Sequence, residues 1–162
     1  MILLNSVLVA TDFGDTSQTA LTYGRNLARA FGAKLHVLHV TEPLLVGAAE
    51  FYPQGLDDRE DVEEASKKRL EALLTADDRR MLHAKPVVRV SASVAEAIVE
   101  YAREAHVDVV VVGTHGRGPV SHFFLGSVAE KVVRTAPCPV LTVRRNEHEF
   151  VLPDPVPIHA RL

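Results

Sequence analysis

The chain contains a single cysteine, Cys138, which excludes an intramolecular disulfide and is typical of a reducing compartment. Its 162 residues carry a formal net charge of −3, so there is no positive field to attract nucleic acid or a membrane surface. No apolar run is long enough to span a bilayer. The apolar N-terminus lacks basic residues and is expected to form a strand, not a signal peptide. These absences predict a cytoplasmic globular protein with neither nucleic acid nor membrane as a partner.

Short apolar segments alternate with amphipathic ones along most of the chain. Strands are expected at 7–10, 34–40, 86–90, 108–112 and 140–143, and helices at about 15–31, 57–80, 93–105 and 127–135. Ser93 and Glu96 have the spacing of a capping box at the start of the third helix. The first and fourth strands are apolar on both faces, as in parallel sheets covered by helices on both sides. The pattern predicts one doubly wound α/β domain over residues 1–145.

Residues 146–162 depart from this alternation. Three closely spaced prolines favour an extended C-terminal segment. Its apolar residues suggest docking on its own subunit or on a partner, and the alternative is a flexible terminus.

The fourth expected strand runs directly into a glycine-rich loop that leads to the last helix. Two familiar phosphate-binding patterns fail in this loop. Gly113-x4-Gly118 is followed by Pro119 and Val120 where a P-loop needs Lys and Ser or Thr, and the dinucleotide pattern from Gly116 lacks its third glycine. A third pattern, Gly113-x2-Gly116-x9-Gly126-Ser127, has all of its residues in this loop and at the start of the last helix. It combines glycines that permit close backbone approach with a helix N-terminus that favours anions.

Asp12 follows the first strand, and Val40 closes the second. Ligands of open α/β sheets bind at the carboxyl ends of the strands, where the strand order reverses. An acidic residue that faces a glycine loop there suits a ribose on one side and phosphates on the other. The alternative is structural: Asp12 and Ser127 only cap helices, and the glycines only form turns.

Three segments together resemble the ATP-binding branch of the universal stress protein family over about residues 1–145. They are the opening Val-Ala-Thr-Asp12, the glycine spacing of the loop, and the ending Gly126-Ser-Val-Ala-Glu-Lys-Val-Val-Arg134 with Ala136-Pro-Cys-Pro-Val140-Leu-Thr-Val-Arg144. The resemblance implies a Rossmann-like or flavodoxin-like α/β fold whose five-stranded parallel sheet has the order 3-2-1-4-5. It also implies ATP, ADP or AMP in the cleft, with Mg²⁺ or Mn²⁺ on the phosphates.

The family pattern also assigns roles within the site. Asp12, with Thr11 beside it, approaches the ribose and phosphates, Val40 meets adenine through its backbone, and Gly113 lines the ribose. The residues implied to hold phosphates are Gly116, Gly126, Ser127 and Val128. Arg117 either neutralises phosphate charge or is a solvated loop residue.

The fifth expected strand, 140–143, lies at the edge of the sheet and is too apolar to remain uncovered. Pairing of this edge in a homodimer is expected, with a higher oligomer as an extension.

Three functions remain open at this point. The first is an ATP-binding homodimer that regulates or senses stress through an unidentified protein partner. The second is an interaction module that binds no nucleotide, and the third is a slow ATPase or adenylyl-transfer enzyme. No catalytic residue is predicted, since no nucleophile and base stand out. The Gly113→Val and Gly126→Val variants are expected to abolish nucleotide binding while leaving the fold largely intact.

Overall fold

A computed structural model describes residues 1–43, 58–114 and 126–144. Within these ranges the chain forms one five-stranded sheet, all parallel, with the order β3-β2-β1-β4-β5. The strands are β1 (Ser6–Ala10), β2 (Lys34–Thr41), β3 (Lys85–Val90), β4 (Val109–Gly113) and β5 (Val140–Val143). The helices are α1 (Asp15–Phe31), α2 (Asp58–Leu73), α3 (Ala76–Leu82), α4 (Val94–Glu104) and α5 (Ser127–Thr135). The predicted α/β class and strand order are confirmed.

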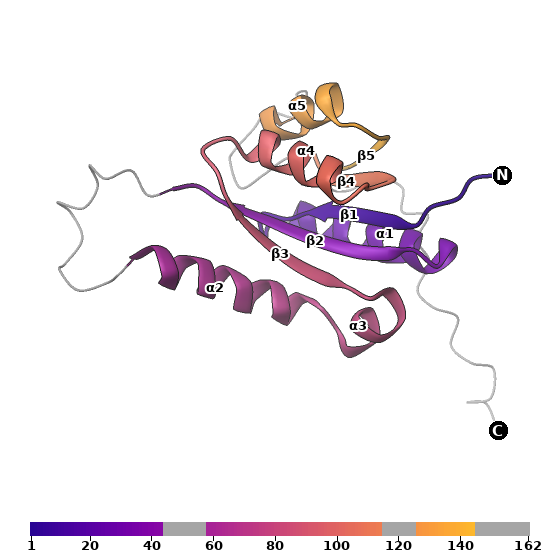
Figure 1. Cartoon of the computed structure of the whole chain (residues 1–162), viewed down its shortest axis with the longest axis horizontal. Coiled ribbons are helices and arrows are strands. Elements are labelled where there is room, and N and C mark those ends of the chain that lie inside the picture. The colour runs from indigo at the N-terminus through magenta and orange to yellow at the C-terminus, as the bar shows by residue number, and fades with distance from the viewer. Residues whose placement is uncertain (44–57, 115–125, 145–162) are drawn as a thin grey trace.

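The sheet separates two apolar cores, because side chains of successive strand residues point to opposite faces. Val7 and Val9 of β1 pack on the side of α1, α2 and α3. Leu8, between them in sequence, packs on the side of α4 and α5. Figure 1 shows the same layering, with α4 and α5 on one side of the strands and α1, α2 and α3 on the other. Helix α1 lies so close to β1 that a Cβ at Gly24 would be 2.2 Å from Cγ2 of Val9.

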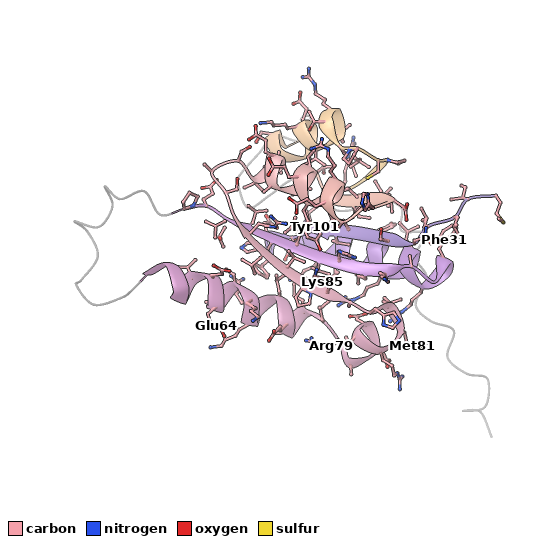
Figure 2. The ribbon with its side chains drawn as sticks, in the orientation of Figure 1. Phe31, Glu64, Arg79, Met81, Lys85 and Tyr101 are labelled. Atoms are coloured by element: carbon pink, nitrogen blue, oxygen red, sulfur yellow. The ribbon has the colours of Figure 1, made fainter. Side chains whose placement is uncertain are left out.

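The segment expected to be one helix over 57–80 is two helices. Helix α2 ends at Leu73 and α3 begins at Ala76, with Thr75 as its N-cap. Thr75 and Asp78 form a reciprocal capping box: the Thr75 hydroxyl accepts from the Asp78 N–H, and the Asp78 carboxylate accepts from the Thr75 N–H. A new helix therefore starts where the hydrophobic periodicity alone indicated a continuous one. Glu64 of α2 and Arg79 of α3 project from the outer surface of this pair (Figure 2).

The capping box expected at Ser93 does not form. Ser93 is the N-cap of α4, but its side chain makes no capping hydrogen bond within the described residues. Glu96 instead accepts from Nζ of Lys131 on α5 at 2.7 Å. A contact between two helices has replaced the local contact that the sequence spacing favoured.

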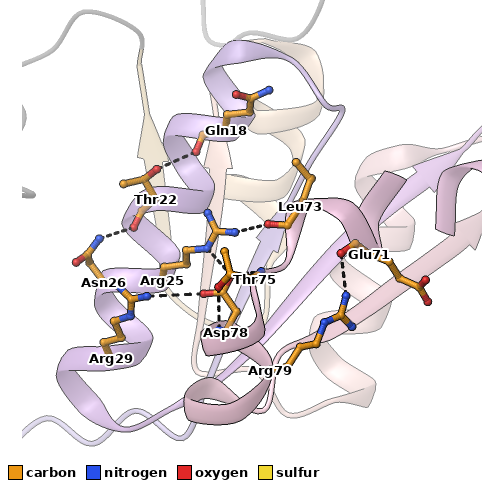
Figure 3. Close-up of polar contacts among 10 residues, drawn as sticks. All are labelled: Gln18, Thr22, Arg25, Asn26, Arg29, Glu71, Leu73, Thr75, Asp78 and Arg79. Carbon is orange, nitrogen blue, oxygen red and sulfur yellow. Dashed lines mark hydrogen bonds and ion pairs between the residues drawn. The ribbon is translucent and has the colours of Figure 1, made fainter. Parts of the chain in front are cut away.

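Asp78 also fastens α3 to α1. Its side chain is fully buried, and its Oδ2 accepts from Nε of Arg25 at 2.9 Å. The Arg25 guanidinium also donates to the Leu73 carbonyl at the end of α2, and Arg29 lies 3.9 Å from Asp78 Oδ1. Figure 3 shows the two arginines of α1 converging on this carboxylate.

None of the helices in the described part of the chain combines the length and the apolar character that crossing a membrane requires.

Candidate functional site

A cleft of about 370 Å³ opens at the carboxyl ends of the strands. It lies where β1 and β4 are neighbours and the connections turn to opposite faces of the sheet, the usual ligand position in such folds. Its lining comes from β1 and the loop after it, from β2 and β4, and from the first turns of α4 and α5.

The loop after β1 supplies the polar wall of the cleft. Asp12 Oδ1 accepts from the N–H of Gly14 at 2.9 Å, and the Thr11 hydroxyl accepts from the N–H of Phe13 at 3.0 Å. Ser17 ties the start of α1 to this loop, since its Oγ lies 3.0 Å from Thr11 Oγ1 and donates to the Gly14 carbonyl. The loop is therefore held by its own side chains, with the Asp12 carboxylate at the cleft.

The other part of the cleft is apolar. It is lined by side chains from β1, β2, β4, α4 and α5, namely Ala10, Leu38, Val40, Val94, Ile98, Val112, Val128 and Ala129. A cleft with apolar walls on one side and a few convergent polar groups on the other suits a ligand with a flat apolar part and a charged part.

Two helix N-termini border this cleft. Helix α5 begins at Ser127 behind Gly126, and α4 begins at Val94; all three of these residues line the cleft. Gly126 has no side chain to cap α5, and the Ser93 side chain does not cap α4 within the described residues. The first N–H groups of a helix have no partner inside the helix, and together with the helix dipole they attract anions.

A positive side chain lies beside the N-cap of α4. The Lys131 ammonium contacts Glu96 and lies 3.5 Å from Ser93 Oγ. Its hydrogen bond and its charge lower the pKa of the Glu96 carboxyl below the ordinary value of 4.5. The sequence reading missed this bridge, because only the fold brings residues 96 and 131 together.

The structure brings together seven of the nine residues predicted for the site. The residues that line the cleft are Thr11, Asp12, Val40, Gly113, Gly126, Ser127 and Val128. Gly116 and Arg117 lie outside the described residues. The ligand contacts of all nine stay a prediction.

Gly113 has a second role that the sequence reading missed. A Cβ at this position would lie 2.9 Å from Cγ2 and 3.2 Å from the carbonyl carbon of Thr16 on α1. The absence of a side chain is therefore needed for packing of β4 against α1, whatever the ligand. The expectation that Gly113→Val leaves the fold largely intact stays a prediction, and these contacts with Thr16 argue against it.

His39, Val94 and Ile98 also line the cleft and were not among the predicted residues. Val94 and Ile98 carried only a core signal in the sequence, the helical spacing of apolar residues. Their position above β2 makes them part of the apolar wall.

Comparison with known proteins agrees with this architecture. The model of the universal stress protein family matches residues 4–144. A universal stress protein encoded in the QAH/OAS sulfhydrylase 3′ region of Thermus aquaticus is 37% identical over 147 residues, covering 88% of this chain and all of the relative. The solved universal stress protein UspA of Lactobacillus plantarum has the same fold, with a TM-score of 0.69 at 23% identity, over 89% of this chain and 100% of that one. A universal stress protein solved in complex with cAMP has a TM-score of 0.60 at 25% identity, over 88% and 98%.

Proposed function

The chain belongs to the universal stress protein family, and from that premise we propose that its cleft binds an adenine nucleotide, ATP, ADP or AMP. The observation that carries the proposal is the cleft itself: an apolar wall, one carboxylate and an uncapped helix N-terminus meet at the strand-order reversal. The complex of a related structure with cAMP supports an adenine nucleotide as the ligand class.

We assign each part of the nucleotide to a different group of cleft residues. Adenine lies among the apolar side chains beside Val40 and Ile98, where a flat ring buries apolar surface. The Asp12 carboxylate accepts hydrogen bonds from ribose hydroxyls. The phosphates lie at Gly126 and Ser127, where backbone N–H groups and a hydroxyl donate to phosphate oxygens.

A divalent ion fits this site only as a companion of the phosphates. The described residues contain no group of three or more His, Cys, Asp or Glu side chains that could cage a metal. Mg²⁺ commonly keeps several waters and binds through one or two carboxylates plus substrate phosphates. Asp12 would be the protein ligand, and the ion would neutralise phosphate charge.

We propose further that the protein works as a cytoplasmic, homodimeric regulator whose nucleotide state changes the surface offered to a partner. The polar groups of the cleft within the described ranges include a carboxylate and hydroxyls, which suit holding a nucleotide. The proposal does not require turnover of ATP.

Calorimetric titration of nucleotide-free protein with AMP and ATP, each with and without Mg²⁺, tests the proposal. We expect saturable binding, and we expect Asp12→Ala to weaken it about tenfold, on the order of 1.4 kcal/mol. Asp77→Ala is the matched control, since this exposed carboxylate on α3 pairs with Arg80 away from the cleft. Absence of binding by the unaltered protein at millimolar nucleotide would leave the interaction-module function in its place.

A further inference from the structure

Phe13, next to Asp12, has a backbone conformation that bulky residues avoid. Its φ is +65°, in the left-handed region. Such a conformation is unfavourable for a side chain of this size and persists only where the surroundings hold it. Residues of this kind gather at functional sites, and this one lies in the loop that forms the polar wall of the cleft.

Two side chains, from β2 and from α2, contact the Phe13 ring. The His39 ring, at the end of β2, lies with its centroid 4.3 Å from that of Phe13. The Arg69 guanidinium, from the outer helix α2, lies over the ring at 4.1 Å from its centroid. The ring also packs against the core on the α1 and α2 side of the sheet. Stacking with cations and aromatic rings stabilises this placement and offsets the backbone cost.

Hydrogen bonds from His39 and within the loop hold the backbone around Phe13. Nδ1 of His39 lies 2.8 Å from the Thr11 carbonyl oxygen, which can only accept, so this nitrogen donates. The Phe13 N–H donates to Thr11 Oγ1, and the next amide, of Gly14, donates to Asp12 Oδ1. The turn of the chain at Phe13 is thus what brings the Gly14 amide under the Asp12 carboxylate.

We propose that Phe13, clamped between His39 and Arg69, is a positioning residue that presents Asp12 to the ligand. The inference rests on the proposed nucleotide function. It adds a residue outside the cleft lining, Arg69 of α2, which affects nucleotide affinity through its contact with the Phe13 ring. Disturbance of α2 at Arg69 then weakens nucleotide binding without any contact between that helix and the nucleotide.

The test compares AMP affinity and unfolding midpoint between the unaltered protein and a set of variants. Phe13→Leu keeps an apolar side chain but removes the ring, and we expect AMP to bind about tenfold more weakly because the loop loses its preorganisation. Phe13→Tyr keeps the ring and is expected to bind within about twofold of the unaltered protein. Arg69→Gln is expected to weaken binding about threefold, and its neighbour Lys68→Gln, with the same charge change on the same helix, to have no effect.

Phe13→Gly guards against a variant that fails to fold, since glycine adopts a φ of +65° without strain. It is expected to fold and to lose AMP affinity as Phe13→Leu does. If Phe13 acts through Asp12, the double variant Asp12→Ala/Phe13→Leu binds no more weakly than Asp12→Ala alone. Losses that add, or full affinity in Phe13→Leu, would overturn the proposal.

A readout without nucleotide separates this inference from the proposed function. The hydrogen-exchange rate of the Gly14 amide reports its hydrogen bond to Asp12. We expect the unaltered protein and Phe13→Tyr to share a slow exchange rate, and we expect Phe13→Leu and Phe13→Gly to exchange faster. If the unaltered protein binds no nucleotide but the exchange rates follow this pattern, only the proposed function fails. If Phe13→Leu exchanges as slowly as the unaltered protein, the positioning role of Phe13 is wrong.

Discussion

His36 and His39 stand three apart on β2 and so serve opposite faces of the sheet. His36 reaches the hydroxyl of Tyr101 on α4 at 2.7 Å, and His39 stacks on Phe13 below the sheet. Tyr101 lies between α4 and β2 in Figure 2. The alternation of a strand thus gives one histidine to the loop after β1 and the other to the packing of α4.

His36 makes folding stability depend on pH. Burial lowers its pKa below the ordinary value of 6.5, and the ammonium groups of Lys85 and Lys34 lower it further. The unfolded chain therefore takes up this proton at a higher pH than the folded chain does. Stability is then lost as the pH falls below about 6.5, toward the lowered pKa of the folded state.

We expect His36→Gln to reduce the loss of stability between pH 7.5 and pH 5.5, measured as the shift in the urea midpoint. Tyr101 contacts His36, Arg89 lies over the Tyr101 ring, and Glu104 pairs with Arg89. Each variant is measured at both pH values. His83→Asn, at the exposed C-cap of α3, is the matched control, because asparagine tolerates the left-handed conformation there. An unchanged pH dependence in His36→Gln would contradict this account.

Sequence reasoning at the scale of residues succeeded where position along the chain carries the information. Asp12, Val40 and Ser127 each adjoin the carboxyl end of a strand or the N-terminus of a helix, and the parallel sheet brings such positions to one cleft. It failed for contacts between residues that are far apart in the sequence and meet only in the fold. The Thr16 backbone beside Gly113, and Arg69 over Phe13, are contacts that no spacing in the sequence encodes.

At the scale of elements, the interruption between α2 and α3 is the clearest departure from expectation. Hydrophobic spacing continues through Leu70 and Leu74 to Leu82, all of which are buried, so periodicity alone gives no sign of a break. The signal was Thr75 and Asp78, a capping pair within an apparently continuous helix. Conversely, Ser93 and Glu96 have the spacing of a capping box but do not form one. Glu96 instead forms an ion pair with Lys131 of α5.

We expect Asp78→Asn to lower the free energy of unfolding by about 2 kcal/mol. The change leaves Arg25 without its anionic partner and weakens the cap of α3, and partial exposure of Arg25 keeps the loss below that of a fully buried pair. Urea unfolding measures the effect. Asp77→Asn, in the adjacent exposed pair with Arg80, should change stability by less than about 0.5 kcal/mol. Equal effects of the two variants would show that the Asp78 network does not anchor α3.

At the scale of the whole molecule, the strand order was predictable from family resemblance, and the α/β class from the alternation of elements. The sequence predicted β5 as a sheet edge, and the structure has it there. Pairing of this edge between two subunits stays a prediction. The proposed tail, 146–162, lies outside the described residues.

A single backbone group tests the proposed dimer. Val110 N–H donates to the Pro139 carbonyl and Thr114 N–H to the Val143 carbonyl, so alternate residues of β5 carry the ladder to β4. By this register the N–H of Thr142 faces the open edge. We expect the unaltered protein to sediment as a dimer, Thr142→Pro as a folded monomer, and Thr142→Val as a dimer. A monomeric unaltered protein, or a dimeric Thr142→Pro, would exclude pairing through β5.

The central claim is that the cleft holds an adenine nucleotide. The most direct measurement is mass spectrometry of the small molecules released when purified protein is denatured, repeated after reloading stripped protein with AMP or ATP and Mg²⁺. The account predicts an adenine nucleotide approaching one per chain in the unaltered protein and a marked loss in Asp12→Ala. No adenine nucleotide in either preparation, from protein shown to be folded, would contradict it.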